Sequence, residues 1–346
     1  MIQAVTAAVI WCLVLCLLPG ARTRKDHSIL IAAVAIATAL SLNVDPIYIA
    51  GDRALGGRNL LDLFANILMV VGIYFLSQAI LRAAELNDAP VGKDRLGLMV
   101  LGLVSAGLVL AFLYVEAPVS STRFMLDYGD QSAAALYSAI QFVYIGVVVG
   151  VTGYVCFRFR RRMAASYFRV AFTLIGIGCF LALFVVFSVL GMDLAHLLGD
   201  QSTMLQLAAL YDTSFVVAMF FLCAGLALPP VARRIVHRTQ HKTQAGLLED
   251  LTSTWEKATA TRKDGRLATP AGVIERGDPE TRRLHRMLVE IEDALLMDPA
   301  AANLLHEADF QTLTRTEHYL ASHRDTQQGN RLGIARWGRG KNSSGR

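Results

Sequence analysis

The sequence is poor in charge and lacks the residue patterns that catalytic and metal sites require. Only 18% of its 346 residues are charged, against about 25% in a typical soluble protein. It has five cysteines, but no Cys-x-x-Cys pair, which argues against a disulfide framework and a zinc site. There is no His-Glu-x-x-His helix or glycine-rich phosphate loop, and no acid pair or Ser/His/Lys set at one depth. We therefore expect no enzymatic activity, no metal and no cofactor.

Long apolar stretches are what the chain does contain. Hydrophobic residues make up 54% of it, and the mean hydropathy is +0.44. The excess falls in runs of about 17–25 residues, the length that crosses about 30 Å of hydrocarbon as a helix. Because a bilayer offers no water to unpaired backbone groups, we predict an all-α fold with a seven-helix transmembrane bundle over residues 1–230. The predicted spans are 3–19, 29–44, 60–81, 97–115, 133–156, 167–190 and 206–228.

The first two spans are the least regular. No basic residue precedes the first and no Ala-x-Ala site follows it, so an uncleaved helix is favoured over a signal peptide. The second is the shortest, since Asn43, Asp45 and Pro46 interrupt its end. The spacing Gly146-x-x-x-Gly150 permits close helix packing, but it leaves the oligomeric state open.

Lysine and arginine gather in the loops of one side. They follow the first, third, fifth and seventh spans, whereas the opposite loops hold only Arg53, Arg58 and Arg123. By the positive-inside rule, we predict a plasma-membrane protein with its N-terminus outside and its C-terminus in the cytoplasm. The net charge of +5 thereby has a topological explanation, and no nucleic-acid partner is expected.

A basic cluster follows the fifth span. At this depth it would meet anionic headgroups, where each lysine or arginine gains about 1 kcal/mol. The candidate lipid contacts are Arg158, Arg160, Arg161 and Arg162. We therefore expect a bilayer with anionic lipids as a partner. The alternative is a plain stop-transfer anchor without specific lipid binding.

Several polar side chains fall inside or beside the spans, where ionisable groups are costly and mark functional sites by default. Asp62 and Asn66 lie one helical turn apart and so share a helix face. By the predicted orientation all candidates lie toward the external leaflet: Asp62, Asn66, Asp212, Tyr211, Gln141 and Asp45. We predict an outward-facing polar pocket for a ligand or cation, with Asp62 and Asp212 as its deepest acids. Interhelical hydrogen bonds without a ligand are the alternative.

The polar C-terminal region has its own helical pattern. Pro229-Pro230 should end or bend the seventh span, and 231–260 reads as a juxtamembrane amphipathic helix. A linker over 261–277 follows. Two helix starts at Asp-Pro pairs then predict a cytoplasmic helical hairpin over 278–325. The basic end, 326–346, is expected to be disordered.

Two segments carry a resemblance to a known family. RNLLDLFANILMVVGIYFL (58–76) resembles the third span, and TRRLHRMLVEIEDALLMD (281–298) the tail helix, of an actinobacterial family of multi-pass membrane proteins. The family commonly has Leu-x-x-Leu-Trp after its last span, where this chain has Thr254 before Trp255. The resemblance implies an integral membrane protein, labelled a transporter, with a cytoplasmic domain of unknown function. It assigns no functional residue.

The sequence thus predicts a multi-pass integral membrane protein and leaves two functions open. One is a transporter-like protein that uses the polar pocket. The other is a membrane sensor or regulator whose cytoplasmic helical tail binds a protein partner.

Overall fold

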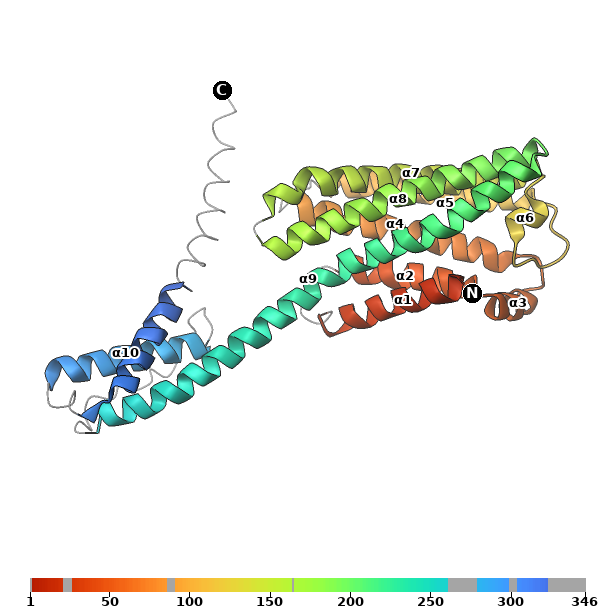
Figure 1. Ribbon diagram of the computed structural model, residues 1–346. Helices are drawn as coiled ribbons and strands as arrows, with labels where there is room; N and C mark the ends of the chain where they lie inside the picture. The colour runs from red at the N-terminus through yellow and green to blue at the C-terminus, as the bar shows by residue number, and fades with distance from the viewer. Residues whose placement is uncertain are drawn as a thin grey trace, which may run out of the picture. The chain divides into compact units, whose positions relative to one another are not determined.

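The computed structural model describes residues 2–20, 27–85, 91–163, 165–260, 279–298 and 304–322. Over these residues the regular structure is helical and contains no strand, which confirms the all-α class (Figure 1). The chain divides into two compact units, Met1–Arg233 and Arg234–Arg346.

The first unit is a bundle of long helices that run side by side (Figure 1). The short helices α3 and α6 lie at the same end of this bundle, which we call the α3/α6 end. The helices of this unit are α1 (Ile2–Leu17), α2 (Ser28–Leu42), α3 (Asp45–Ala54), α4 (Leu60–Glu85), α5 (Val91–Leu113), α6 (Phe124–Tyr128), α7 (Ser132–Phe159), α8 (Ser166–Leu197) and the first part of α9 (Gln201–Ala258).

Five helices of the described residues are long and apolar enough to cross a membrane: α4, α5, α7, α8 and α9. The bent pair α2 and α3 makes a sixth if it is counted as one span. The apolar helix α1 has 16 residues and is therefore only about 24 Å long. The structure thus fits a multi-pass membrane protein by helix length and composition, while the number seven stays a prediction.

The second predicted span ends in a sharp bend. α2 ends at Leu42, and α3 begins at Asp45 at an angle of 86° to it. Pro46 lies in the first turn of α3, where its missing amide costs no helical hydrogen bond. The polar residues that shortened the predicted span are therefore the residues at which the chain turns.

α4 packs against α2, α5 and α7, and α7 packs along α8. The contact between α2 and α4 depends on Gly72, where a Cβ atom would lie 2.5 Å from Cγ1 of Ile36 and 3.2 Å from the carbonyl oxygen of Ala32. On the other side of the bundle, a Cβ on Gly153 of α7 would lie 3.0 Å from Cβ of Cys179 in α8. Small residues thus let neighbouring helices approach closely, as membrane bundles require.

The prolines of α9 do not end it. α9 contains both Pro229 and Pro230 and continues to Ala258, so the predicted helix over 231–260 is a continuation of α9 and not a separate element. Each proline removes one backbone donor. The loss is confined to about two hydrogen bonds, and the helical turns on both sides maintain the helix.

The second unit contains the end of α9, α10 (Pro279–Met297) and a helix over residues 307–322. Apolar side chains from all three form its core: Leu247, Leu251, Leu284, Ile291, Leu313 and Leu320. Within the predicted hairpin, 278–325, the described residues 279–298 and 304–322 therefore pack together with the end of α9. The predicted linker over 261–277 and the basic end over 326–346 lie outside the described residues.

Candidate ligand-binding cavity

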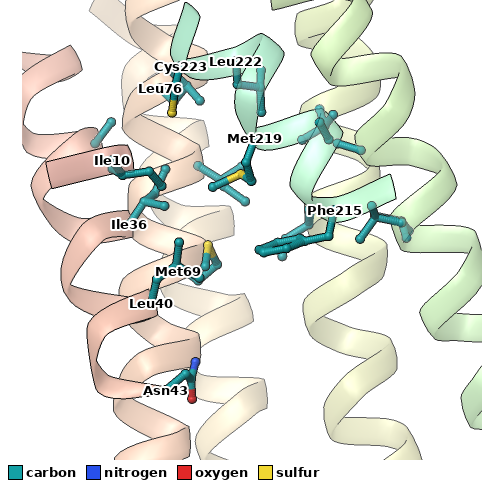
Figure 2. Close-up of a pocket in the computed structure, with 18 of the residues that line it drawn as sticks. Ile10, Ile36, Leu40, Asn43, Met69, Leu76, Phe215, Met219, Leu222 and Cys223 are labelled. Atoms are coloured by element: carbon teal, nitrogen blue, oxygen red, sulfur yellow. The ribbon is translucent and has the colours of Figure 1, made fainter. Parts of the chain in front are cut away.

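A cavity of about 520 Å³ lies inside the first unit, lined by residues of α1, α2, α4, α7, α8 and α9 and by the segment before α6. Most of its lining is apolar. Figure 2 shows Ile36 and Leu40 of α2 and Met69 of α4 facing Phe215 and Met219 of α9. Small-molecule sites in proteins have volumes of about 300–1,000 Å³ and mostly apolar walls with a few polar groups. The cavity meets both conditions.

Most of the polar lining residues, including the charged ones, gather toward the α3/α6 end of the bundle. Asn66, Gln141 and Tyr211 fall within the first few turns of α4, α7 and α9. Asp45 opens α3, and Asp212 follows Tyr211. The cavity therefore has a polar end and an apolar body.

The structure brings five of the six predicted pocket residues to the cavity wall: Asp45, Asn66, Gln141, Tyr211 and Asp212. Asp45 and Asp212 are exposed, whereas Gln141 is buried. Asp62, predicted as one of the deepest acids, does not line the cavity. It lies one turn before Asn66 and is bonded to it.

A hydrogen-bonded chain joins Asp62 to the wall. Asn66 Nδ2 donates to Asp62 Oδ2 over 2.9 Å and to the Tyr137 hydroxyl over 2.8 Å. The Tyr137 hydroxyl donates to the same carboxylate oxygen over 3.0 Å. Gln141 Nε2 donates to Asn66 Oδ1 over 3.0 Å. This series of hydrogen bonds connects α4 to α7. The interhelical hydrogen bonds that were the alternative to a pocket are therefore present together with the cavity.

A second polar pair lines the cavity farther from the α3/α6 end. The hydroxyl of Thr152 in α7 lies 2.9 Å from the hydroxyl of Ser77 in α4. Single hydroxyls are common in membrane helices, where they bond to their own backbone. Neither residue stood out in the sequence for that reason.

The α3/α6 end is fixed by a buried carboxylate that the sequence did not reveal. Asp52 is fully buried and accepts hydrogen bonds from the amides of Asn59, over 2.9 Å, and Leu61, over 3.2 Å. The hydroxyl of Ser120 donates to it as well. Asn59, at a φ of 57°, accepts from the Tyr48 hydroxyl over 2.9 Å. These contacts tie α3 to the start of α4 and to the loop before α6.

Two further buried polar atoms lie between α7 and α8. Oδ2 of Asp193 and the Ser138 hydroxyl make no hydrogen bond of good geometry among the described residues, although the two side chains lie close enough to interact with each other. Asp193 escaped notice because the predicted span ended at residue 190, whereas α8 continues to Leu197. Neither residue lines the cavity.

The candidate lipid contacts lie at the C-terminal end of α7, with Arg158 in its last turn and the other three just after it. Arg158 is exposed, and its Nη1 donates to the Tyr154 hydroxyl over 3.2 Å. The guanidinium of Arg160 lies 5.5 Å from the centre of the Phe157 ring, and Arg161 is exposed. The side chain of Arg162 lies outside the described part of the structure. Arginines stacked on aromatic rings are typical of a membrane interface.

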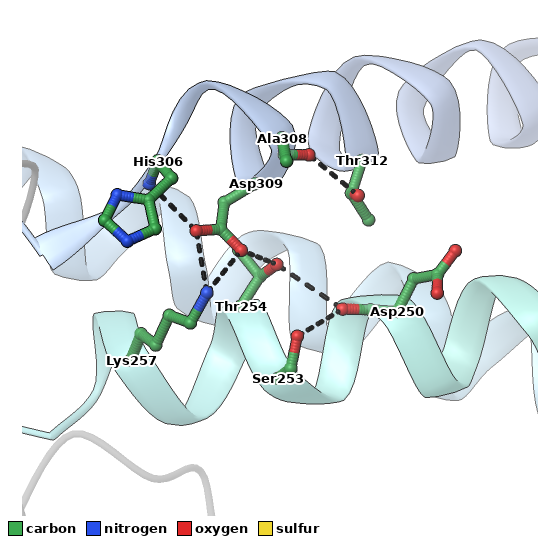
Figure 3. Close-up of polar contacts among 8 residues, drawn as sticks. All are labelled: Asp250, Ser253, Thr254, Lys257, His306, Ala308, Asp309 and Thr312. Carbon is green, nitrogen blue, oxygen red and sulfur yellow. Dashed lines mark hydrogen bonds and ion pairs between the residues drawn. The ribbon is translucent and has the colours of Figure 1, made fainter.

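In the second unit the main polar contact is centred on Asp309 (Figure 3). Its carboxylate accepts from Lys257 Nζ over 2.9 Å, from the Thr254 hydroxyl over 3.1 Å and from the His306 amide over 2.9 Å. Burial alone would raise the pKa of this carboxyl, but the His306 amide, Lys257 and Thr254 together hold the pKa below its ordinary value. The bond to His306 is that of a capping box at the helix start.

α10 is joined to α9 by a second buried acid. Glu290 accepts from the Trp255 indole nitrogen over 2.7 Å and from Nε of Arg286 over 2.8 Å. Thus the buried acids of this unit have hydrogen-bond partners that connect its helices.

Comparison of the chain with models of protein families, with curated proteins and with solved structures gives no match. The resemblance to the actinobacterial family therefore stays a prediction. The function has to be argued from the chemistry of the cavity.

Proposed function

We propose that the chain is a multi-pass membrane protein that binds an amphipathic small molecule in the cavity of its helical bundle, as a transporter-like protein does. The observation that supports this proposal is that most polar lining residues gather at one end of the cavity, whereas the rest of the wall is mainly apolar. A ligand with a polar head would place it near Asn66, Gln141 and Asp212. Its apolar chain would lie among Met69, Met219 and their neighbours, where burial of each CH₂ contributes about 0.8 kcal/mol.

The polar end of the cavity faces the exterior in this proposal. The positive-inside rule supports this orientation. α7 starts next to α6, and Arg158 and Arg161 lie at its other end, Arg158 in the last turn and Arg161 just after the helix. Labelling with a membrane-impermeant maleimide in intact cells tests the orientation. Asp130→Cys, in the loop between α6 and α7, should be labelled, and Arg161→Cys should be labelled only after the cells are opened. The reverse pattern would invert the proposed topology.

Photolabelling tests the binding site. Full-length protein in lipid nanodiscs is irradiated with decanol that carries a diazirine on its alkyl chain, and the labelled residues are mapped by mass spectrometry. Label should appear on Met69 and Met219. Because the label is mapped by residue, partition of the probe into lipid does not obscure the result.

A matched pair of variants on α9 sharpens this test. Met219→Trp fills the cavity and should abolish the label on Met69. The neighbouring Phe220 is 63% exposed and does not line the cavity, so Phe220→Trp should leave the label unchanged. Label found only on exposed side chains such as Phe220, or equal effects of the two variants, would refute binding in the cavity.

A sensor or regulator is the second candidate function, and α9 is the observation that favours it. α9 contributes Tyr211 and Met219 to the cavity lining, and its C-terminal residues Leu247 and Leu251 to the core of the second unit. If the protein is a sensor, saturation with decanol should change hydrogen exchange in α10, and the tail should have a cytoplasmic protein partner. Unchanged exchange would favour the transporter-like function.

A further inference from the structure

The polar end of the cavity carries more negative than positive charge. Of the described residues that line it, Asp45 and Asp212 are acids and Arg123 is a base. A third carboxylate, Asp62, lies directly behind the wall, bonded to Asn66. Among the described residues its hydrogen bonds come from neutral groups, Asn66 and Tyr137.

The orientation of Asn66 follows from Asp62. A carboxylate oxygen accepts hydrogen bonds, and the amide nitrogen of Asn66 faces Asp62 Oδ2. That nitrogen has two hydrogens, and its contacts to Asp62, 2.9 Å, and Tyr137, 2.8 Å, use both. Asn66 therefore has no donor left for a ligand, and its remaining capacity is at the oxygen.

The same reasoning extends to Gln141. Its Nε2 donates to Asn66 Oδ1 over 3.0 Å, which directs one amide hydrogen away from the cavity. An amide oxygen has two lone pairs and an amide nitrogen two hydrogens, so Asn66 Oδ1 keeps one lone pair after this bond, and Gln141 keeps its Oε1 and one amide hydrogen. Both residues line the cavity. The wall at this point is accordingly rich in acceptors.

An aromatic pair adds a third attraction for positive charge. The rings of Tyr211 and Phe215 stack with their centres 5.7 Å apart, and both side chains line the cavity. The face of an aromatic ring attracts a cation within about 6 Å. Carboxylates, amide oxygens and ring faces all favour a positively charged hydrogen-bond donor over an anion.

We infer that the head of the ligand is a primary ammonium group, so that the ligand class is a single-chain amphipathic amine. This inference rests on the proposed function, because it names the head of a molecule whose chain fills the same cavity. The ammonium would donate to Asp212, to Gln141 Oε1 and to Asn66 Oδ1. A carboxylate or phosphate head would meet two acids of the cavity wall, Asp45 and Asp212, against one arginine, Arg123.

Competition between three probes that share one alkyl chain tests the inference. Decylamine, decanol and decanoate are each added to the full-length protein in nanodiscs, and each is measured for its ability to prevent diazirine-decanol from labelling Met69. Since charge-assisted hydrogen bonds are stronger than neutral ones, decylamine should compete at a concentration about tenfold lower than decanol. Decanoate should be the weakest competitor.

Two charge-neutralising variants assign the preference to the site. Asp212→Asn should reduce the advantage of decylamine over decanol by about three- to tenfold while decanol itself still competes. Asp130→Asn removes the same charge from an exposed residue at the α3/α6 end that does not line the cavity. It should leave the advantage unchanged.

The outcomes distinguish a failure of the ammonium inference from a failure of ligand binding in the cavity. If diazirine-decanol does not label Met69 at all, binding in the cavity fails and the head-group inference fails with it. If the label is present but the three probes compete equally, or decanoate competes best, the cavity binds amphipaths and the ammonium inference alone is wrong. An equal loss of preference in Asp130→Asn would overturn it as well, because the effect would then arise from general surface charge.

Discussion

Asp309 in the second unit and Asp62 in the first are both carboxylates held by hydrogen bonds, yet their surroundings differ. Asp309 faces the positive charge of Lys257 and the amide of His306, so its charge is balanced where it lies. Asp62 is bonded to the neutral groups of Asn66 and Tyr137, and one of these lines a cavity. The first arrangement joins helices. The second orients the side chain of Asn66 in the cavity wall.

The largest loss of stability is expected for substitution of Asp52. Like Asp309, it is an acid whose hydrogen bonds connect separate parts of the fold. Asp52→Asn introduces an amide where three donors converge, and an unsatisfied buried group of this kind costs about 3 kcal/mol. The free energy of unfolding in mixed micelles should fall by that amount. Asp130→Asn is the control and should stay within about 0.5 kcal/mol. A small change in the free energy of unfolding of Asp52→Asn would show that the hydrogen bonds of Asp52 do not stabilise the fold.

Asp309→Asn should be the next largest. It removes an ion pair and part of a capping box, and the second unit should lose about 2 kcal/mol of local stability. Backbone hydrogen exchange in α10 and in the helix over 307–322 of the full chain measures the change. Glu307→Gln removes the same charge from an exposed residue two positions earlier and should have little effect. Faster exchange confined to the first unit would contradict the assignment.

Low pH should reproduce part of the stability loss expected for Asp309→Asn. The pKa of Asp309 is lower in the folded protein than its ordinary value, which is about 3.9 in an unfolded chain. Its stabilising contribution is therefore complete above about pH 4 and is lost as the pH falls through the lowered folded pKa. Protection factors in the second unit, which correct for the pH dependence of intrinsic exchange, should fall in that range, so that exchange is accelerated relative to an unfolded chain at the same pH. The acceleration should be smaller in Asp309→Asn, and an identical pH profile in both proteins would exclude this carboxyl as the cause.

The smallest effect is expected for substitution of the arginines at the C-terminal end of α7. Each basic residue near an anionic surface contributes about 1 kcal/mol, so Arg158→Ala with Arg161→Ala should reduce the anionic lipid that co-purifies with the protein. Lipid analysis of protein extracted in nanodiscs measures this. Diazirine-decanol labelling of Met69 should not change. A loss of label without a loss of anionic lipid would mean that these arginines act on the cavity and not on headgroups.

Much of the fold is local and could be predicted from the sequence. The apolar runs at 133–156 and 167–190 correspond to α7 and α8, which extend to Phe159 and Leu197. A hydropathy pattern ends where polar residues begin, but a helix continues as long as its backbone bonds are made. The polar extension of α8 therefore hid Asp193. The break between α2 and α3 was visible as Asn43, Asp45 and Pro46, although its angle was not.

The prediction of the site was limited in the same way. Five of the six predicted residues line the cavity. They could be found because polar side chains in apolar segments are rare, and their common depth followed from the orientation. Which of them line a cavity could not be predicted. Asp62 and Asn66 share one face of α4, one turn apart, yet only Asn66 reaches the cavity wall. The Asp52 contacts were also out of reach, since Ser120 is separated from it by 68 residues.

The most direct measurement is a cryo-EM density map of the full-length protein in lipid nanodiscs saturated with decylamine. The account predicts density for one alkyl chain between Met69 and Met219, with its amine near Asp212 and Gln141, and no such density in Met219→Trp. A cavity closed by side chains, or filled identically with and without decylamine, would contradict it.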